Sequence, residues 1–318
     1  MNNLPRISVL IICYNQEQLI KRAIESLLSQ KEYIYQICVS DDCSSDRTWD
    51  ALLEYQQQYP ELFNLNRNEP NVGIFQNLEK VWTMPDGDIV YGLAGDDVCG
   101  ENWFKTIIDY INDNHIDYLN EKFCIYSDHK CVYPNGDSYV VKNKYCLLPL
   151  SQMKKYERGL VFGRGRCYSI NVLKEFRKTS QGRSFIAENA QDSQVHIFSD
   201  KFYYIPQVGN IYYASIGVSS NMNVQRQKEH EQTMVYAFEC FEKWGIKIDK
   251  YDKNLPAYNI ARKKFIAHKT VSNYINMLYL FFKAYDPKVG LKGFDIFNIR
   301  RMAFRVLRRL PHSKPINW

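Results

Sequence analysis

Strand-like and helix-like segments alternate at short intervals through the first hundred residues of the chain. Residues 6–13 are almost continuously apolar, as expected of a parallel strand that is covered on both faces. Residues 17–29 then carry apolar side chains at helical spacing, namely Leu19, Ile20, Ala23, Ile24, Leu27 and Leu28. This alternation predicts an α/β fold with a mostly parallel central sheet and helices on both faces.

The same alternation continues along the chain. Further strands are predicted at 36–40, 62–66 and 88–93, with helices from Ser44-Ser45-Asp46 as N-cap through Tyr55 and at 74–83. After residue 100 the pattern predicts a helix at 102–112, a strand at 123–127, a hairpin turn at 133–137, a helix at 190–198 and two strands in 202–213 that break at Pro206. Long helical patterns begin near residue 225. We therefore expect one α/β domain over 1–224 and a C-terminal helical extension over 225–318.

Composition indicates an ordinary globular protein. The 318 residues are 45% apolar and 24% charged, with a net charge of +6. The nine cysteines do not show zinc-ligand spacing, and Cys13, Cys38 and Cys124 lie in apolar runs that predict buried thiols in a reducing compartment. Neither a signal peptide nor an apolar run of membrane-spanning length is visible, so the expected location is cytoplasmic.

Polar side chains follow the predicted strands where each strand ends. Tyr14-Asn15 follow the first strand, Asp41-Asp42 the second and Asp96-Asp97 the fourth, and the turn Asn71-Val72-Gly73 opens a helix. Parallel strands bring their carboxyl ends to one edge of the sheet, where open α/β sheets bind ligands. We therefore expect these groups to converge on one crevice.

The acidic pair Asp96-Asp97 favours a metal-bound phosphate as the ligand. Two hard oxygen donors after a buried strand suit Mg²⁺ or Mn²⁺, which binds phosphates readily. A polar turn or a helix N-cap is the alternative interpretation of this pair. Tyr14 would stack on a nucleotide base, Asp42 would accept a hydrogen bond from a base N–H group, and the metal would hold the pyrophosphate.

Four segments together resemble the family 2 glycosyltransferases. They are Ile7–Asn15, Val39–Thr48 with its Asp-Asp-x-Ser-x-Asp pattern, Asn71-Val72-Gly73-x-x-x-Asn77, and Gly87-Asp88 followed by Leu93-x-x-Asp96-Asp97. The resemblance is close over residues 6–105 and weaker to about 220. It implies the GT-A fold, an α/β sheet that binds nucleotide sugars.

The resemblance implies a role for each matching residue. Tyr14 and Asn15 would contact the base, and Asp42 would read it. Asp96 would touch the ribose and Asp97 the metal. Asn71 and Gly73 belong to the turn beside the nucleotide. Many members have a further acid where this chain has Ala94, and this departure points to weaker metal affinity or an altered ribose contact.

Sugar transfer to a hydroxyl also needs a general base. In the family, a Glu-Asp pair that opens a short helix before a Tyr-Ile-Pro strand supplies it. Here Tyr204-Ile205-Pro206 is preceded by Glu188-Asn189-Ala190-Gln191-Asp192. Asp192 is the predicted base and Glu188 the fallback, with a structural first-turn carboxylate as the alternative for Asp192.

Another departure lies near the leaving diphosphate. Many members carry Arg and His after the next strand, where this chain has Ala214-Ser215-Ile216. Arg164, Arg166 or Lys201 are candidates to replace that positive charge, with surface solvation as the alternative.

The C-terminal segment 298–310 predicts a cationic amphipathic helix. Its apolar residues share one face, and Arg301, Arg305, Arg308 and Arg309 occupy the other. Such a helix suits an anionic membrane surface, so residues 295–310 predict peripheral membrane contact. A helix packed on the protein with a solvated basic face is the alternative. Nucleic acid is disfavoured, because the basic charge is confined to this tail.

The expected function is that of an inverting glycosyltransferase. It would use a nucleotide-diphosphate sugar, with UDP favoured by the resemblance, and Mn²⁺ or Mg²⁺. The acceptor would be a hydroxyl of a cell-envelope glycan or a lipid-linked acceptor. A non-catalytic nucleotide-sugar-binding or scaffolding subunit is the rival, motivated by the departures at Ala94, Gln191 and Ala214-Ser215-Ile216. A nucleotidyltransferase is disfavoured because no glycine-rich loop follows the first strand. The sequence leaves the sugar, the linkage and the oligomeric state open.

Overall fold

The computed structural model describes residues 4–147, 164–179, 195, 198–214, 254, 257–258, 260–262, 264–265 and 268–285. The chain divides into two compact units, Met1–Leu148 with Phe162–Asn223, and Pro149–Val161 with Val224–Trp318. The boundary predicted at 224/225 lies outside the described residues and stays a prediction.

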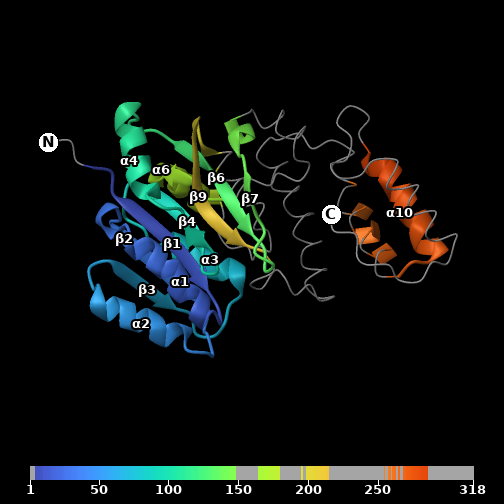
Figure 1. Ribbon diagram of the computed structural model, residues 1–318, viewed down its shortest axis with the longest axis horizontal. Coiled ribbons are helices and arrows are strands. Elements are labelled where there is room, and N and C mark those ends of the chain that lie inside the picture. Colours follow the sequence, from blue (N-terminus) through green and yellow to red (C-terminus); the bar gives the residue numbers. More distant parts are fainter. Residues whose placement is uncertain are drawn as a thin grey trace. The chain divides into compact units, whose positions relative to one another are not determined.

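One mixed sheet forms the framework of the first unit (Figure 1). Among the described residues it has nine strands in the order β3-β2-β1-β4-β8-β6-β9-β5, with β7 paired to β6. The four strands at one side are mutually parallel, as predicted: β1 (Ile7–Cys13), β2 (Gln36–Asp41), β3 (Phe63–Arg67) and β4 (Ile89–Ala94). β1 and β2 are almost completely buried, which explains their continuous apolar sequence.

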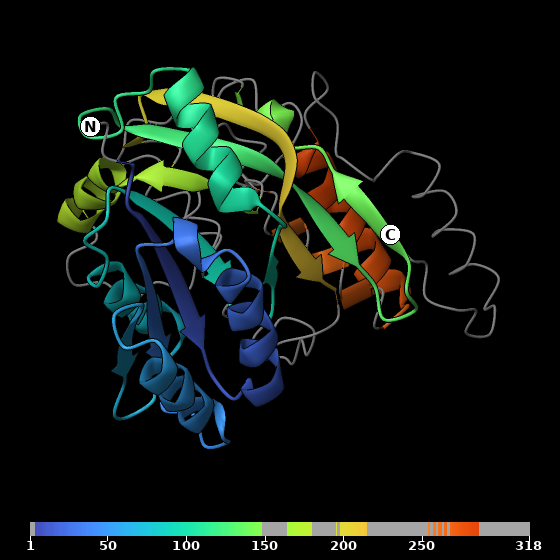
Figure 2. The ribbon, with the colours of Figure 1, turned by 60° about the vertical axis from the view of Figure 1, so that its left-hand side comes forward.

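Helices connect these parallel strands and cover the sheet (Figures 1 and 2). The connecting helices are α1 (Glu17–Leu28), α2 (Thr48–Gln58) and α3 (Ile74–Trp82), and α4 (Trp103–Asp113) comes after β4 in the chain. The buried side chains of α1 are Ile20, Ala23, Ile24 and Leu27. α1 and α2 contact each other, whereas α3 contacts β1 and β2. Because the chain reverses direction across the sheet between β3 and β4, right-handed crossovers place α3 on the opposite face.

The other half of the sheet combines four short antiparallel pairs with the long parallel pair of β6 and β9, and its β5, β8 and α6 are elements that the sequence pattern did not indicate. Its elements are β5 (Val98–Cys99), β6 (Phe123–Val132), β7 (Ser138–Val141), β8 (Cys167–Ser169), α6 (Ile170–Thr179) and β9 (Lys201–Tyr213). The short β8 joins the halves by pairing antiparallel with both β4 and β6. The predicted hairpin turn at 133–137 is confirmed, since Tyr133 and Asp137 close it by a backbone hydrogen bond of 2.8 Å. The described residues of this unit also include the 3-10 helices Lys31–Tyr33 and Lys144–Leu147.

The predicted break at Pro206 is wrong. β9 is one continuous strand that pairs parallel with β6, and the register shifts from Ser127 opposite Ile205 to Asp128 opposite Val208. Proline lacks the N–H group that a regular ladder requires. A bulge absorbs this loss without ending the strand.

The start of α2 also differs from the prediction. The helix begins at Thr48, and its backbone N–H donates to the Asp46 side chain at 2.9 Å. Asp46 therefore satisfies a first-turn donor, as an N-terminal carboxylate does. Ser44 and Ser45 instead belong to the loop that follows β2.

The core lies between the sheet and its helices. Its largest fully buried side chains include Trp103, Tyr91 and Phe104, and the last two rings meet edge to face with centroids 5.3 Å apart. Cys13, Cys38 and Cys124 are buried as predicted, and no disulfide joins the cysteines that the structure describes.

The second unit is described mainly by α10 (Val271–Ala284). Its N-cap Thr270 accepts a hydrogen bond from the Asn273 backbone at 3.2 Å. Met277, Phe281 and Ala284 pack with Tyr258 and Phe265 into a small core of their own. No helix among the described residues is both long and apolar enough to cross a bilayer. The predicted amphipathic helix 298–310 lies outside the described residues.

Candidate functional site

The structure brings the predicted strand-end residues to one edge of the sheet. β1 lies between β2 and β4, with Cys13 opposite Asp41 and Ile12 opposite Ala94. Tyr14, Asp42 and Asp96 therefore leave three adjacent strands at the same level. With neighbouring strands about 4.8 Å apart, the ends of β2 and β4 lie roughly 10 Å apart across β1, a span that fits a nucleoside joined to a diphosphate.

Asp42 is buried, with 4% of its surface exposed, at the start of α3. Its carboxylate accepts hydrogen bonds from the backbone N–H groups of Val72 at 2.9 Å and Gly73 at 2.8 Å, and from the Asn68 amide at 3.0 Å. Backbone donors at a helix N-terminus favour a negative charge. Gly73 adopts φ +86°, in the left-handed region that favours glycine, although a Cβ there would meet no atom within 4 Å.

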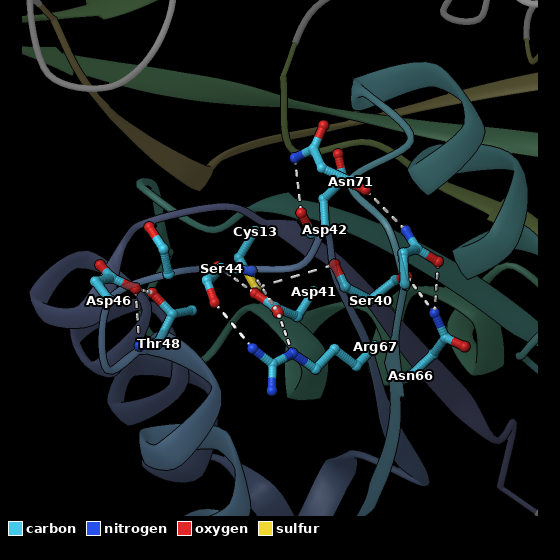
Figure 3. Close-up of polar contacts among 12 residues, drawn as sticks. Cys13, Ser40, Asp41, Asp42, Ser44, Asp46, Thr48, Asn66, Arg67 and Asn71 are labelled. Atoms are coloured by element: carbon cyan, nitrogen blue, oxygen red, sulfur yellow. Dashed lines mark hydrogen bonds and ion pairs between the residues drawn. The ribbon is translucent and has the colours of Figure 1, made fainter.

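Asparagine side chains hold the β2 loop and the turn before α3 together. Asn71 donates to the Asp42 carbonyl at 2.7 Å, and Figure 3 shows the Asn71 side chain directed at it. Asn77 is buried and donates to the Ser40 carbonyl at 3.0 Å. Asn71, Gly73 and Asn77 thus belong to one network with Asp42, which explains why these residue types recur together in the sequence pattern.

Asp41 is a second buried carboxylate, and its side chain points toward Ser44 and Arg67 and not toward Asn71 (Figure 3). It accepts from the Ser44 backbone at 3.0 Å and from the Ser44 hydroxyl, and the Arg67 Nε lies 3.5 Å from it. Burial and the neighbouring Asp41 raise the pKa of the Cys13 thiol. Asp41 braces the loop, and Asp42 next to it faces α3.

Tyr14 and Asn15 differ in their surroundings. Tyr14 has 41% of its surface exposed, as a ring that stacks on a base requires. Asn15 adopts φ 51°, and its backbone N–H donates to the Ser44 hydroxyl at 2.9 Å while its side-chain oxygen accepts from Ser45 N–H at 2.8 Å. Asn15 therefore ties the ends of β1 and β2 together.

At the end of β4, Asp96 lies half-buried beside two arginines. The Arg22 guanidinium of α1 donates to the Asp96 backbone carbonyl at 2.7 Å and lies 3.7 Å above the Tyr213 ring. Burial raises the pKa of the Asp96 carboxyl above its ordinary value, and the charges of Arg164 and Arg22 oppose that shift. The Asp96 carboxyl therefore sits in a partly desolvated, positively charged environment.

Asp97 is more deeply buried, with 2% exposure. One of its carboxylate oxygens lies 3.4 Å from Arg164 Nη1 and 3.4 Å from the Asn210 amide nitrogen. Arg164 also lies 4.0 Å over the Tyr212 ring. Of the three basic residues considered for the diphosphate, Arg164 lies at Asp97, and Arg166 lies just before β8. Lys201 pairs with Glu121 at 2.6 Å at the start of β9.

The oxygen atoms of Asp97 and Asn210 are candidate ligands for a divalent cation that also keeps water or phosphate ligands. No cluster of three or more His, Cys, Asp or Glu side chains exists among the described residues. Asn210 is buried with 2% exposure, and within the same part of the chain its carbonyl Oδ1 has no hydrogen-bond partner. The Asn210 amide nitrogen faces Asp97; with this amide turned over, one carboxylate and one buried amide oxygen would match the few protein ligands that Mg²⁺ and Mn²⁺ take at phosphate sites.

The predicted general base cannot be placed against this site. Asp192 and Glu188 lie outside the described residues, and their roles stay predictions. Two positions of the predicted helix 190–198 are described as helical, and of these Val195 is buried and Phe198 half-buried. At the end of β9, Ala214 is buried and donates to the Val132 carbonyl at 2.8 Å, while Ser215 and Ile216 lie outside the described residues.

Sequence reasoning missed three residues of the site. Arg22 gave no signal, because it sits among the polar positions of an amphipathic helix. Asn68 looked like an ordinary loop residue. Asn210 could have been noticed from the sequence, because it is a polar amide between a glycine and the apolar Ile211 within a predicted strand. A polar side chain that is buried in a strand needs a hydrogen-bond partner.

The N-terminal half of the chain matches a known protein family. Residues 8–158 match the model of "Glycosyl transferase family 2". The chain is 31% identical to the putative glycosyltransferase EpsE of Bacillus subtilis over 98 residues, which cover 31% of this chain and 35% of EpsE. It is 27% identical to the putative colanic acid biosynthesis glycosyl transferase WcaA of Escherichia coli over 169 residues, covering 52% of this chain and 55% of WcaA.

Similarity at the level of structure reaches further along the chain. The crystal structure of S. aureus TarS 1–349 in complex with UDP-GlcNAc superposes with a TM-score of 0.61 at 16% identity, covering 87% of this chain and 79% of that one. This likeness confirms the predicted GT-A type of α/β fold. The sequence matches span 26% to 55% of the length of the curated relatives, so they cover only part of each of those proteins.

Proposed function

We propose that this chain transfers a sugar from a nucleotide-diphosphate sugar to a hydroxyl group, because its residues 8–158 match the model of glycosyl transferase family 2. The observation that carries this proposal is the placement of Tyr14, Asp42 and Asp96-Asp97 at the ends of three adjacent parallel strands. Open α/β sheets bind their ligands at such an edge.

The β2 side of the crevice would bind the nucleoside. Tyr14 offers an exposed ring for stacking, and the hydrogen bonds from Val72 and Gly73 fix the Asp42 carboxylate in one orientation. Each carboxylate oxygen has two lone pairs, so Oδ2, which accepts from Gly73, keeps a second position for a base N–H group. UDP is the proposed carrier, supported by the UDP-GlcNAc complex of the structurally similar TarS.

The β4 side would bind the diphosphate. Asp97 and Asn210 are the residues that would hold Mn²⁺ or Mg²⁺, and Asp96 would contact the ribose. Such a cation, when bound, stabilises the negative charge that develops on the departing diphosphate. Arg22 and Arg164 add positive charge from the protein itself on the same side.

Transfer would follow a single in-line displacement that inverts the anomeric carbon. The acceptor oxygen forms a bond to that carbon as the bond to the diphosphate oxygen breaks, and the acceptor proton passes to Asp192. Glu188 takes this role if Asp192 does not. The nucleotide diphosphate leaves with the electron pair of the broken bond.

The proposed acceptor is a cell-envelope glycan or a lipid-linked sugar on the cytoplasmic side of the membrane. The name of WcaA, which refers to colanic acid biosynthesis, supports a polysaccharide acceptor. The basic amphipathic pattern of residues 298–310 supports peripheral contact with an anionic membrane, which would bring the site to a lipid-linked acceptor.

A donor screen followed by a turnover assay tests this function. In a thermal-shift screen of nucleotide sugars with Mn²⁺, the correct donor raises the melting temperature, because a ligand that binds only the folded state stabilises it. Release of the nucleotide diphosphate then reports turnover. Asp192→Asn should bind the donor and lose turnover, whereas the control Asp200→Asn changes an exposed carboxylate paired with Lys122 and should keep it.

Two outcomes would count against the proposal. Donor binding without turnover under any condition would favour the non-catalytic, nucleotide-sugar-binding subunit instead. Turnover retained by Asp192→Asn but lost by Glu188→Gln would move the base role to Glu188.

A further inference from the structure

Asp97 pairs with a cation supplied by the protein. Its carboxylate is almost completely buried, and an unpaired buried charge is strongly unfavourable. The Arg164 guanidinium provides the compensating charge at 3.4 Å. That distance exceeds the roughly 2.7–2.9 Å of a strong charge-assisted hydrogen bond, so this ion pair is a long one.

Arg164 is built so that its end can move while its backbone stays. Its side chain is 38% exposed and rests 4.0 Å above the Tyr212 ring, a second favourable contact for a guanidinium. The next residue, Gly165, adopts φ +75°, and a Cβ at this position would lie 2.7 Å from Ser127 Oγ and 2.9 Å from Asn210 Cβ. The backbone is therefore closely packed beside a long side chain that reaches the edge of the site.

A divalent cation and the Arg164 guanidinium would compete for the negative charge of the Asp97 carboxylate, whose Oδ2 lies 3.4 Å from Arg164 Nη1. Like charges at contact distance repel strongly, most of all where water is excluded. The repulsion would therefore drive the Arg164 guanidinium away from Asp97 when a divalent cation binds there. Asn210 carries no charge and can remain beside the carboxylate during the exchange.

We propose that Arg164 is the counter-ion of Asp97 before the donor binds, and that it moves onto the donor diphosphate when a divalent cation takes its place. This inference rests on the proposed function, because it requires a cation and a diphosphate donor. It assigns to Arg164 the positive charge that many family members supply after β9, where this chain has Ala214. Charge stays balanced at each step, since the cation brought to Asp97 arrives with the anionic diphosphate that receives Arg164.

The exchange predicts opposite effects of one substitution on two ligands. Arg164→Gln removes the competitor, so Mn²⁺ alone should bind about tenfold or more tightly, as measured from the electron paramagnetic resonance signal of free Mn²⁺. The same variant should bind UDP about tenfold more weakly at saturating Mn²⁺, as measured by calorimetry. Both values lie within the usual range of coupling between two sites. Arg164→Lys retains a positive charge and should restrain Mn²⁺ binding as the parent does.

Arg67→Gln is the matched control. It removes the same charge from the same kind of contact, 3.5 Å from the buried Asp41 carboxylate, and should leave the affinity for Mn²⁺ alone unchanged. Thermal unfolding of each variant verifies that it is folded. Adding Asp97→Asn to either the parent or the Arg164→Gln protein should abolish Mn²⁺ binding.

Equal or weaker Mn²⁺ binding by Arg164→Gln would overturn the exchange, as would Mn²⁺ binding by neither protein. UDP binding by the parent in the same experiment separates this failure from failure of the proposed function. If the parent protein binds UDP but Arg164→Gln leaves the Mn²⁺ affinity unchanged, the proposed nucleotide site stands and the proposed exchange is wrong. If the parent protein binds neither UDP nor Mn²⁺, both the proposed function and the proposed exchange are wrong.

Discussion

The two acidic ends of the sheet edge differ in how the protein satisfies their carboxylates. After β2, Asp42 accepts three hydrogen bonds of 2.8 to 3.0 Å, two of them from backbone N–H groups at the start of α3. After β4, Asp97 is just as deeply buried, yet the Arg164 Nη1 and the Asn210 amide nitrogen each lie 3.4 Å from its carboxylate. One carboxylate is locked in place and the other is loosely neutralised.

This difference indicates that the two carboxylates have different roles within one crevice. A carboxylate fixed by backbone donors keeps one orientation, which suits recognition of a flat base. A carboxylate paired with a side chain that has another resting place suits the exchange of cations during a catalytic cycle. We therefore expect changes on the β2 side to affect stability and nucleoside binding, and changes on the β4 side to affect cation binding and turnover.

The largest effect is expected from Asp97→Asn. Loss of the charge that holds the cation should lower kcat for sugar transfer by about 10³-fold or more, the scale seen when charge stabilisation at a transition state is removed. Nucleotide release under saturating donor measures this. A variant that keeps a tenth of the parent rate would remove Asp97 from the proposed chemistry.

The second-largest effect is expected from removal of the divalent cation, which should affect ligand binding on the β4 side of the crevice but not on the β2 side. Chelation with EDTA should weaken UDP binding by about 10²-fold, because the diphosphate loses its main counter-charge. Uridine has no phosphate and should bind equally with and without EDTA, since it uses the β2 side alone. Calorimetry with both ligands makes the comparison, and an equal loss for uridine would show that the cation also shapes the nucleoside pocket.

Asp42→Ala should have the larger effect on stability. It leaves three donors around Asp42 without their acceptor and should lower the free energy of unfolding by about 2–3 kcal/mol. Asp97→Ala removes the two 3.4 Å contacts with Arg164 and Asn210 and should cost less. Urea unfolding of the two variants gives both values, and a larger loss for Asp97→Ala would reverse the assignment of the locked and loose carboxylates.

The smallest effect concerns pH and His129, a residue of β6 close to Arg164. Burial, followed by the charge of Arg164, lowers the pKa of His129 to about 4. Between pH 6.5 and 4 the unfolded chain therefore binds a proton that the folded chain does not, so the folded state loses stability as pH falls. Allowing for partial exposure, this loss amounts to about 1–2 kcal/mol.

His129→Gln should remove that loss and flatten the decline in melting temperature between pH 6.5 and 4, relative to the parent. The neutral imidazole already contacts the Asn143 amide at 3.0 Å, and glutamine can replace that acceptor. Parallel curves for the two proteins would contradict the depressed pKa.

The parallel half of the fold could be predicted from sequence because its signals are local. The apolar run of β1 and the helical spacing in α1 each lie within about a dozen residues. The predicted ends of both elements agree with the observed ends to within one residue. β8 is only three residues long and is defined by pairing with β4 and β6. Pro206 suggested a break, because a bulge becomes visible only when the partner strand is known.

The same distinction between local and distant contacts applies to the site. Asp42, Asp96 and Asp97 were found because acids directly follow buried strands. The partners of Asp97 come from positions 67 and 113 residues away, Arg164 and Asn210 respectively. No spacing rule connects such residues, so only the folded chain places them together.

Chemical-shift mapping of cation binding tests the central claim most directly. In the UDP-saturated protein, titration with Mg²⁺ should produce its largest shifts at the backbone amides of Asp96 and Asp97 and at the side-chain amide of Asn210, and small shifts at Asp42 and Ser44. The largest shifts at the β2 side, or none at Asp97, would contradict the account of Asp97 as the cation-binding carboxylate.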